Sequence, residues 1–167
     1  MLAEGPTTAS NIAHNHERWQ QTRLALARFD PRDTVLVTEA DWAGPFRTAG
    51  YLLPEFRTYA MYGRDGEEPR WSYSAYGGDS DYALPHPAGT SRLQLPLGTE
   101  NVLVLDDETA QRAATQPLER IPLGDLGSLY RLPAGPGEIR ALDITDGKLV
   151  PVYDGKAGTP STNSQGR

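Results

Sequence analysis

The chain has 167 residues, of which 38% are hydrophobic, and it carries a formal net charge of −6. Its length suits one domain, and no apolar run approaches the ~20 residues that a membrane-spanning helix needs, so we expect a soluble chain without a membrane span of its own. The negative charge and the short basic runs argue against nucleic acid as a partner, while the absence of cysteine excludes disulfides and thiolate zinc sites.

The first residues of the chain predict an arm followed by a helix. Residues 1–10 are small and polar and lack the basic start and apolar core of a secretion signal, so we expect a flexible arm. A helix is expected to begin between Ser10 and Asn15 and to run to about Phe29, because apolar side chains recur there at helical spacing. Asp30-Pro31 ends this helix.

The next stretch predicts a strand, a short helix and a second strand. Thr34–Thr38 is a β-branched apolar run that is long enough for a buried strand and too short for a helix. Gly44-Pro45 opens the short helix, because proline is tolerated in the first helical turn, and Pro54 ends it. The alternating residues Phe56–Tyr62 predict the second strand.

The remaining chain predicts further strands and one more helix. Trp71–Tyr76 alternates and would pair with Phe56–Tyr62 as a hairpin. Asn101–Leu105 is a second apolar run typical of a buried strand, and Asp106-Asp107 caps a helix over Glu108–Ala114. An edge strand and two more hairpins complete the prediction: Leu93–Leu97, Leu118–Pro122 with Ser128–Leu132, and Glu138–Thr145 with Lys148–Tyr153.

These elements predict an α/β fold. The strand–helix units at Val35 and Val102 imply a small Rossmann-like mixed sheet with helices on its faces, which the added hairpins extend antiparallel. One domain is expected over residues 11–153, and the polar residues 154–167 predict a disordered tail. Neither GxGxxG nor GxxxxGK[ST] occurs in the sequence, so no nucleotide cofactor is expected.

Acidic residues follow the two predicted buried strands. Glu39 and Asp41 come after the first strand, and Asp106 and Asp107 come after the second. Ligands of open α/β sheets bind at the carboxyl ends of strands, so this edge predicts a candidate site for acid–base chemistry or Mg²⁺. The competing interpretation, which we favour, is that Asp41 and Asp107 cap the turns that follow them.

Aromatic residues gather in the predicted hairpin of residues 56–76, interleaved with arginines. An outward row of such side chains suits stacking on sugar rings or a protein interface, and Arg57, Tyr59, Trp71 and Tyr73 are the candidate binding residues. The alternative, and the more common case, is that these rings belong to an aromatic core.

Two short motifs offer metal ligands. His14 and His16 point apart on a helix and would share a metal only in an extended segment, while Asp79 and Asp81 form a DxD tripeptide in a loop where aspartate is common as a turn former. We therefore predict no bound metal and no cofactor.

Several runs in the sequence resemble a known family. They include GPTT at Gly5–Thr8, DWAGPFR at Asp41–Arg47, YLLPE at Tyr51–Glu55, and GSLYRL at Gly127–Leu132. The chain from about Gly5 to Leu132 resembles the soluble C-terminal region that follows the last membrane span of bacterial polytopic glycosyltransferases similar to dolichyl-phosphate-mannose protein mannosyltransferases.

The resemblance implies a role outside the cytoplasm, as a non-catalytic accessory domain that contacts carbohydrate, an acceptor or the membrane portion of such an enzyme. No catalytic residue is carried over, because the loop that holds the catalytic acid in that family has no counterpart in this sequence. Two alternatives stay open: a stand-alone enzyme that uses Asp106 and Asp107, and a protein-interaction module that uses the aromatic hairpin.

Overall fold

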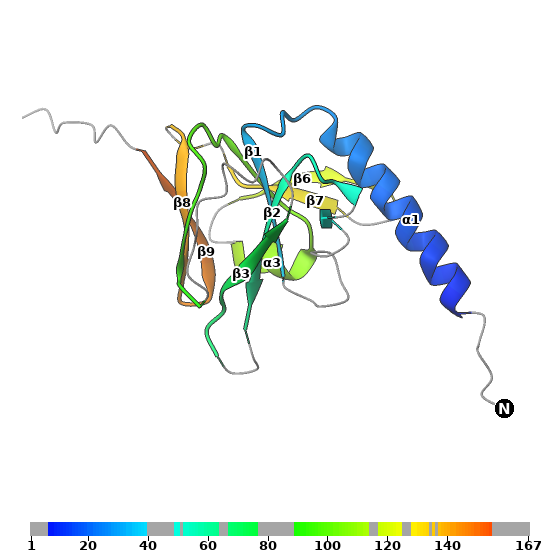
Figure 1. Ribbon diagram of the computed structural model, residues 1–167, viewed down its shortest axis with the longest axis horizontal. Coiled ribbons are helices and arrows are strands. Elements are labelled where there is room, and N and C mark those ends of the chain that lie inside the picture. Colours follow the sequence, from blue (N-terminus) through cyan, green and yellow to red (C-terminus); the bar gives the residue numbers. More distant parts are fainter. Residues whose placement is uncertain are drawn as a thin grey trace, which may run out of the picture.

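A computed structural model describes residues 7–39, 49–50, 52–63, 67–76, 89–113, 117–124, 128–133, 135 and 137–154, with backbone alone over 7–12 and 72–76. It is an α/β structure with a mixed six-stranded sheet, a separate three-stranded antiparallel sheet and helices on both faces of the larger sheet (Figure 1). The predicted α/β class is therefore confirmed.

The described helices and strands occur along the chain in the predicted order. The helices are α1 (Thr7–Leu26) and α3 (Asp107–Ala113). The strands are β1 (Thr34–Glu39), β2 (Arg57–Tyr62), β3 (Arg70–Tyr76), β4 (Arg92–Gln94), β5 (Asn101–Val104), β6 (Glu119–Pro122), β7 (Ser128–Arg131), β8 (Ile139–Thr145) and β9 (Lys148–Tyr153).

The larger sheet has the strand order β3-β2-β1-β5-β7-β6. Strand β1 pairs in parallel with β2 and β5, and Val35 faces Val102 in the register of the second pair. Strands β3, β7 and β6 join antiparallel at the two sides. Strands β1 and β5 are buried at almost every position because both faces of the sheet are covered there.

The last hairpin does not extend this sheet, which differs from the prediction. Strands β8 and β9 form a separate sheet with β4, in the order β4-β8-β9. Their turn, Asp146-Gly147, has positive φ angles of 51° and 69°, as a two-residue hairpin turn requires. The predicted edge strand is β4, which pairs with β8 alone.

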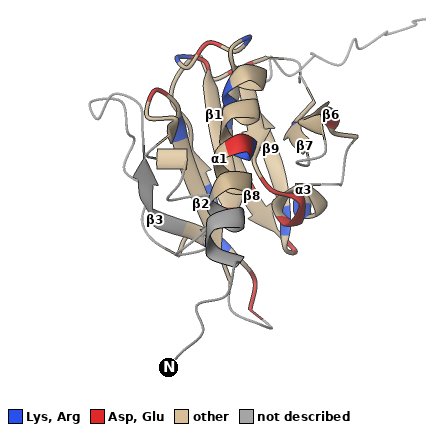
Figure 2. Cartoon of the chain, turned by 90° about the vertical axis from the view of Figure 1, so that its right-hand side faces the viewer, with Lys and Arg blue, Asp and Glu red and all other residues tan. Residues whose placement is uncertain are grey.

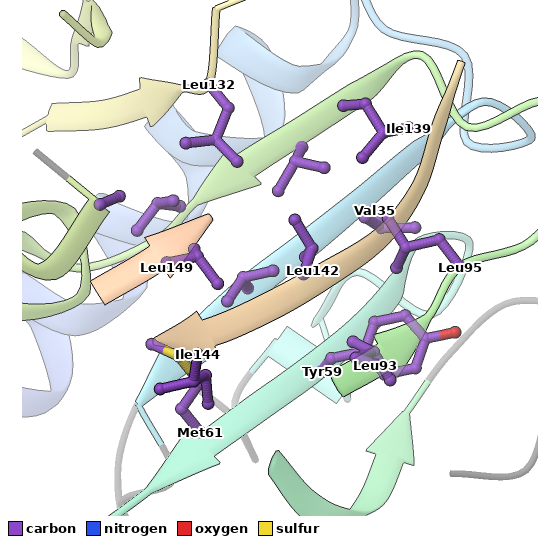
Figure 3. Close-up of a cluster of buried hydrophobic side chains, with 14 of the residues drawn as sticks. Val35, Tyr59, Met61, Leu93, Leu95, Leu132, Ile139, Leu142, Ile144 and Leu149 are labelled. Carbon is purple, nitrogen blue, oxygen red and sulfur yellow. The ribbon is translucent and has the colours of Figure 1, made fainter. Parts of the chain in front are cut away.

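The main hydrophobic core lies between the two sheets. Leu93, Leu142 and Ile144 of the smaller sheet pack against residues of the larger one, including Val35 and Met61 (Figure 3). Ala110 and Ala113 of α3 close the same core. The amphipathic hairpin β8–β9 has an apolar face that must be covered. Stacking on the larger sheet buries this face without adding another strand to that sheet.

A second core lies on the other face, beneath α1, which crosses the front of the larger sheet in Figure 2. Leu26 of α1 packs with Leu36 and Leu103, which alternate along their strands with the residues of the first core. Helix α1 begins at Thr7, inside the predicted arm, and its residues 13–17 are exposed.

Two predicted segments fall partly or wholly outside the described residues. Of the short helix at 44–53, residues 49, 50 and 52 have helical backbone, and the Leu53 amide donates to the Ala49 carbonyl. The tail from residue 155 onward is not described. Neither of the described helices combines the length and the hydropathy needed to cross a membrane.

Candidate functional site

The carboxyl ends of β1 and β5 bring together Glu39, Asp106, Asp107 and Glu108, which we call the carboxyl-edge cluster (red near α3 in Figure 2). Asp106 follows β5 and directly precedes α3. One of its oxygens accepts hydrogen bonds from the Thr38 hydroxyl at 2.9 Å and the Glu39 amide at 3.0 Å. The other accepts the Thr109 amide at 2.7 Å. Asp106 therefore both caps α3 and ties it to β1.

Asp107 holds a tyrosine of the neighbouring strand. The hydroxyl of Tyr130 on β7 donates to the Asp107 carboxylate at 2.8 Å. This hydrogen bond is the largest cause of the raised pKa of Tyr130, since the negative acceptor favours the protonated hydroxyl. Asp107 thus links α3 to β7 at the surface.

Glu39 faces Glu108 in the first turn of α3. Partial burial raises the pKa of Glu39, and the hydrogen bond and negative charge of Glu108 raise it further, while Arg112 acts in the opposite direction. Two carboxyl groups that face each other hold one proton more readily than two isolated groups do. Glu39 therefore takes up a proton more readily than an exposed glutamate does.

The carboxyl-edge cluster places one glutamate of raised pKa, Glu39, beside a second carboxyl group. A carboxyl group with a raised pKa can act as a general acid. Among the residues with described positions, no three histidine or carboxylate side chains converge as metal ligands. The predicted residue Asp41 lies outside the described residues.

The aromatic hairpin requires a correction. Tyr59 and Trp71 are 1% and 0% exposed and belong to the core between the sheets. The Trp71 indole N–H donates to the Leu142 carbonyl at 3.0 Å, so this ring joins the two sheets. Burial raises the pKa of Tyr59. Neither ring forms part of a surface for stacking on sugars, and the aromatic-core interpretation holds for both.

The other predicted residues have varied positions. Arg57, at the start of β2, is half-buried next to Tyr59. The side chain of Tyr73 and the residues Asp79, Asp81 and His86 lie outside the described part of the structure. His14 and His16 are both exposed on α1, and His16 shares a hydrogen bond of 2.8 Å with Gln20.

The opposite edge of the sheet has a hollow that sequence reasoning missed. It has a volume of about 430 Å³ and lies at the amino ends of β1 and β5; we call it the amino-edge hollow. The backbone carbonyl of Asp33 accepts the amides of both Glu100 and Asn101, which joins the loop after α1 to the start of β5. The residues that line the amino-edge hollow are Arg28, Phe29, Asp30, Asp33, Asn101, Glu119 and Arg131.

Two guanidinium groups in this hollow are held by one ring and one carboxylate. The central guanidinium carbons of Arg28 and Arg131 lie 4.9 and 5.9 Å from the centroid of the Phe29 ring. Each arginine reaches a different oxygen of Glu119, at 3.4 and 3.3 Å. These are long ion pairs between partly exposed side chains, so each contributes little to stability.

The remaining polar groups of the hollow are more firmly paired. The Arg32 guanidinium donates to both carboxylate oxygens of Asp30 and thereby lowers the pKa of Asp30 to about 2. One oxygen of Asp33 accepts the Thr34 hydroxyl and the Asn101 amide group. The sequence carried no linear signal for this hollow, because its residues come from one loop and three separate strands.

A second hollow of about 360 Å³ adjoins the first through Arg131. Gly135, Gly137, Glu100 and Glu138 complete its lining. A side chain at Gly135 would meet the Tyr153 ring at 2.0 Å, so glycine is needed for that ring to pack where it does.

With both edges of the sheet described, the chain was compared with other proteins. No protein-family model, no curated protein and no solved structure matches it.

Proposed function

We propose that the chain is a non-catalytic accessory domain that contacts carbohydrate or an acceptor. The observation that carries the proposal is the state of Asp106, the central acid of the carboxyl-edge cluster. Its two oxygens accept hydrogen bonds from the Thr38 hydroxyl and from the backbone amides of Glu39 and Thr109. A carboxylate committed to the backbone in this way stabilises the fold and has little capacity left for substrate or metal.

The family resemblance supplies the rest of the proposal. It suggests that the domain serves a membrane glycosyltransferase outside the cytoplasm. The strand–helix units at Val35 and Val102 suggest, separately, a Rossmann-like sheet, and the parallel pairs β2-β1-β5 are compatible with one, although β8 and β9 form a sheet of their own.

A second candidate function is acid–base catalysis at the carboxyl edge. The observation that favours it is the Glu39–Glu108 pair, because a raised pKa at the carboxyl end of a parallel strand is typical of catalytic acids. The buried indole of Trp71 and the buried ring of Tyr59 weaken the third candidate, a protein-interaction surface on the aromatic hairpin.

The proposal is tested with the purified chain and its Asp106→Ala variant. We expect no hydrolysis or transfer of sugar from lipid-linked or nucleotide-sugar donors. The substitution should instead lower the free energy of unfolding by about 2 kcal/mol, because it removes a helix cap and the link to β1. Urea denaturation followed by circular dichroism measures this loss.

Asp107→Ala is the matched control, since it removes a neighbouring carboxylate whose partner is the exposed Tyr130 hydroxyl. Its cost should stay below about 1 kcal/mol. Sugar turnover that disappears in Glu39→Gln or Glu108→Gln would reject the accessory role and establish the enzyme.

A further inference from the structure

The amino-edge hollow is close to electrically neutral although charged side chains line it. Asp30 is neutralised by Arg32, which binds both of its oxygens. The charges that remain are those of Arg28 and Arg131 against those of Asp33 and Glu119. A bound anion would face two carboxylates and a cation would face two guanidiniums, so the charge balance favours an uncharged polar ligand.

The hollow also has unused hydrogen-bonding capacity. The Nε of Arg131 is buried and has no hydrogen-bond partner among the described residues. Buried donors of this kind are uncommon in native structures. Because this atom is closed off, the donors that Arg131 offers to a ligand are the other N–H groups of its guanidinium. Arg28 and Arg131 each make one long contact to Glu119 and offer further N–H groups, while Asp33 and Glu119 supply acceptors.

The donors are positioned before any ligand arrives. The Phe29 ring lies under both guanidinium groups, and Phe29 itself packs against the core beneath α1. Stacking of this kind limits the rotation of an arginine, which reduces the entropy lost when a ligand binds. The hollow thus combines planar donors and acceptors at fixed positions with a volume of about 430 Å³, in the range typical of small-molecule sites.

We propose that the amino-edge hollow binds a neutral sugar, with Arg131 and Arg28 donating to ring hydroxyls and Asp33 or Glu119 accepting from them. A hydroxyl group both donates and accepts, and vicinal hydroxyls match the planar side chains that line this site. The inference rests on the proposed contact with carbohydrate and moves that contact from the buried aromatic hairpin to the opposite edge of the sheet. The second hollow, reached past Arg131, gives room for a further sugar unit.

The experiment is a titration of the ¹⁵N-labelled full chain with methyl glycosides of glucose, mannose and galactose. We expect millimolar affinity for at least one of them. The shifted signals should be the Nε–H of Arg131 and the backbone amides of Phe29, Asp33 and Asn101. Arg131→Gln and Arg28→Gln should each weaken the affinity at least about tenfold, the effect of losing a hydrogen bond to a charged donor.

Arg112→Gln is the matched control, because the side chains of Arg112 and Arg131 are 32% and 31% exposed and each pairs with one glutamate. Arg112 lies beside the carboxyl-edge cluster, at the other ends of the strands, so its substitution should leave the glycoside affinity unchanged. Arg28 is 55% exposed, so its variant keeps the test valid if Arg131→Gln fails to fold.

Three results would overturn the inference: no shift at the hollow up to about 100 mM glycoside, shifts confined to residues 57–76, or tighter binding of inorganic phosphate than of any glycoside. Each would leave the accessory role standing. Sugar turnover by the chain would remove that role without affecting the shifts, so the two failures are distinguishable.

Discussion

Glu39 occupies an unfavourable position for an ionised carboxyl group. It ends β1 beside Glu108, and Arg112 offsets only part of the effect of burial and of the neighbouring negative charge. Because its pKa is raised above the value of 4.5 that it has in the unfolded chain, the native state binds the proton more tightly. The folded protein therefore loses stability as the pH rises from about 4.5 through the raised pKa.

The corresponding prediction concerns Glu39→Gln, which keeps the shape of the side chain and removes its charge. The variant and the natural chain should have similar urea midpoints near pH 4, and the variant should become the more stable of the two towards pH 7. Glu67→Gln, at an exposed position, is the control and should show no such divergence. A constant difference between variant and natural chain across this range would contradict the assignment.

At the scale of single residues, the sequence predicted position better than role. Asp106 and Asp107 do lie at the carboxyl ends of the strands, because apolar runs end there and helix caps follow. Tyr59 and Trp71 were candidate binding residues on an outward row, with an aromatic core as the more common alternative. They lie in the core because the second sheet covers β2 and β3, which the alternation of one hairpin does not reveal. The roles of Arg28 and Arg131 depend on distant chain segments meeting at Phe29.

At the scale of elements, the strands at the centre of the sheet were the easiest to predict. Val102 and Val104 face the main core, and Leu103 faces the core beneath α1, so a polar residue would be buried at any of these three positions of β5. Runs of this kind identify central parallel strands directly. Residues 35–37 and 102–104 lie on neighbouring strands, since β1 and β5 pair in parallel.

Val104→Asp tests this packing. The side chain of Val104 is 0% exposed, and a charged group there would lose its hydration without gaining a partner. The variant should be destabilised by several kcal/mol and should be largely unfolded at 25 °C. Leu97→Asp, at a position 80% exposed, should melt like the natural chain. If Val104→Asp melted cooperatively at the same temperature as the natural chain, β5 would not be a core strand.

The choice of partner for each hairpin was harder to predict than the hairpins themselves. Strands β6 and β7 extend the large sheet, whereas β8 and β9 pair with β4 and stack on its face. Both hairpins alternate, and local periodicity shows which face of a strand is buried without showing what buries it. The start of α1 at Thr7 was also missed, because the small polar run at the beginning of the chain has no apolar stripe from which a helix could be predicted.

At the scale of the whole molecule, the two sheets depend on each other through a shared core. Trp71 lies at the centre of this dependence, since its ring fills the core and its indole N–H pairs with the Leu142 carbonyl of β8. Neither sheet keeps its side of this shared core buried if the other leaves. We therefore expect a single cooperative unfolding transition for the described domain.

Native-state hydrogen exchange of Trp71→Phe tests this dependence. The substitution leaves the Leu142 carbonyl without its indole donor and should cost about 1–3 kcal/mol. The loss of protection should be equal for Val37 in the large sheet and Ile144 in the small one. Tyr62→Phe, at a position 42% exposed on the paired strand, is the control and should change neither. Lower protection at Ile144 alone would show that the small sheet opens independently.

The outermost strands of the two sheets affect whether the protein aggregates in crowded solution. Strand β6 presents Glu119, Arg120 and Pro122 to solvent, and β9 contains Pro151, which has no amide to donate. On the side of β3, the amide and carbonyl of Trp71 are already paired with Thr90 and Gly89. Charges, prolines and paired backbone each prevent a foreign strand from docking. The same edges that close the fold therefore protect the chain against aggregation by strand addition, even though its described strands hold more residues than its described helices.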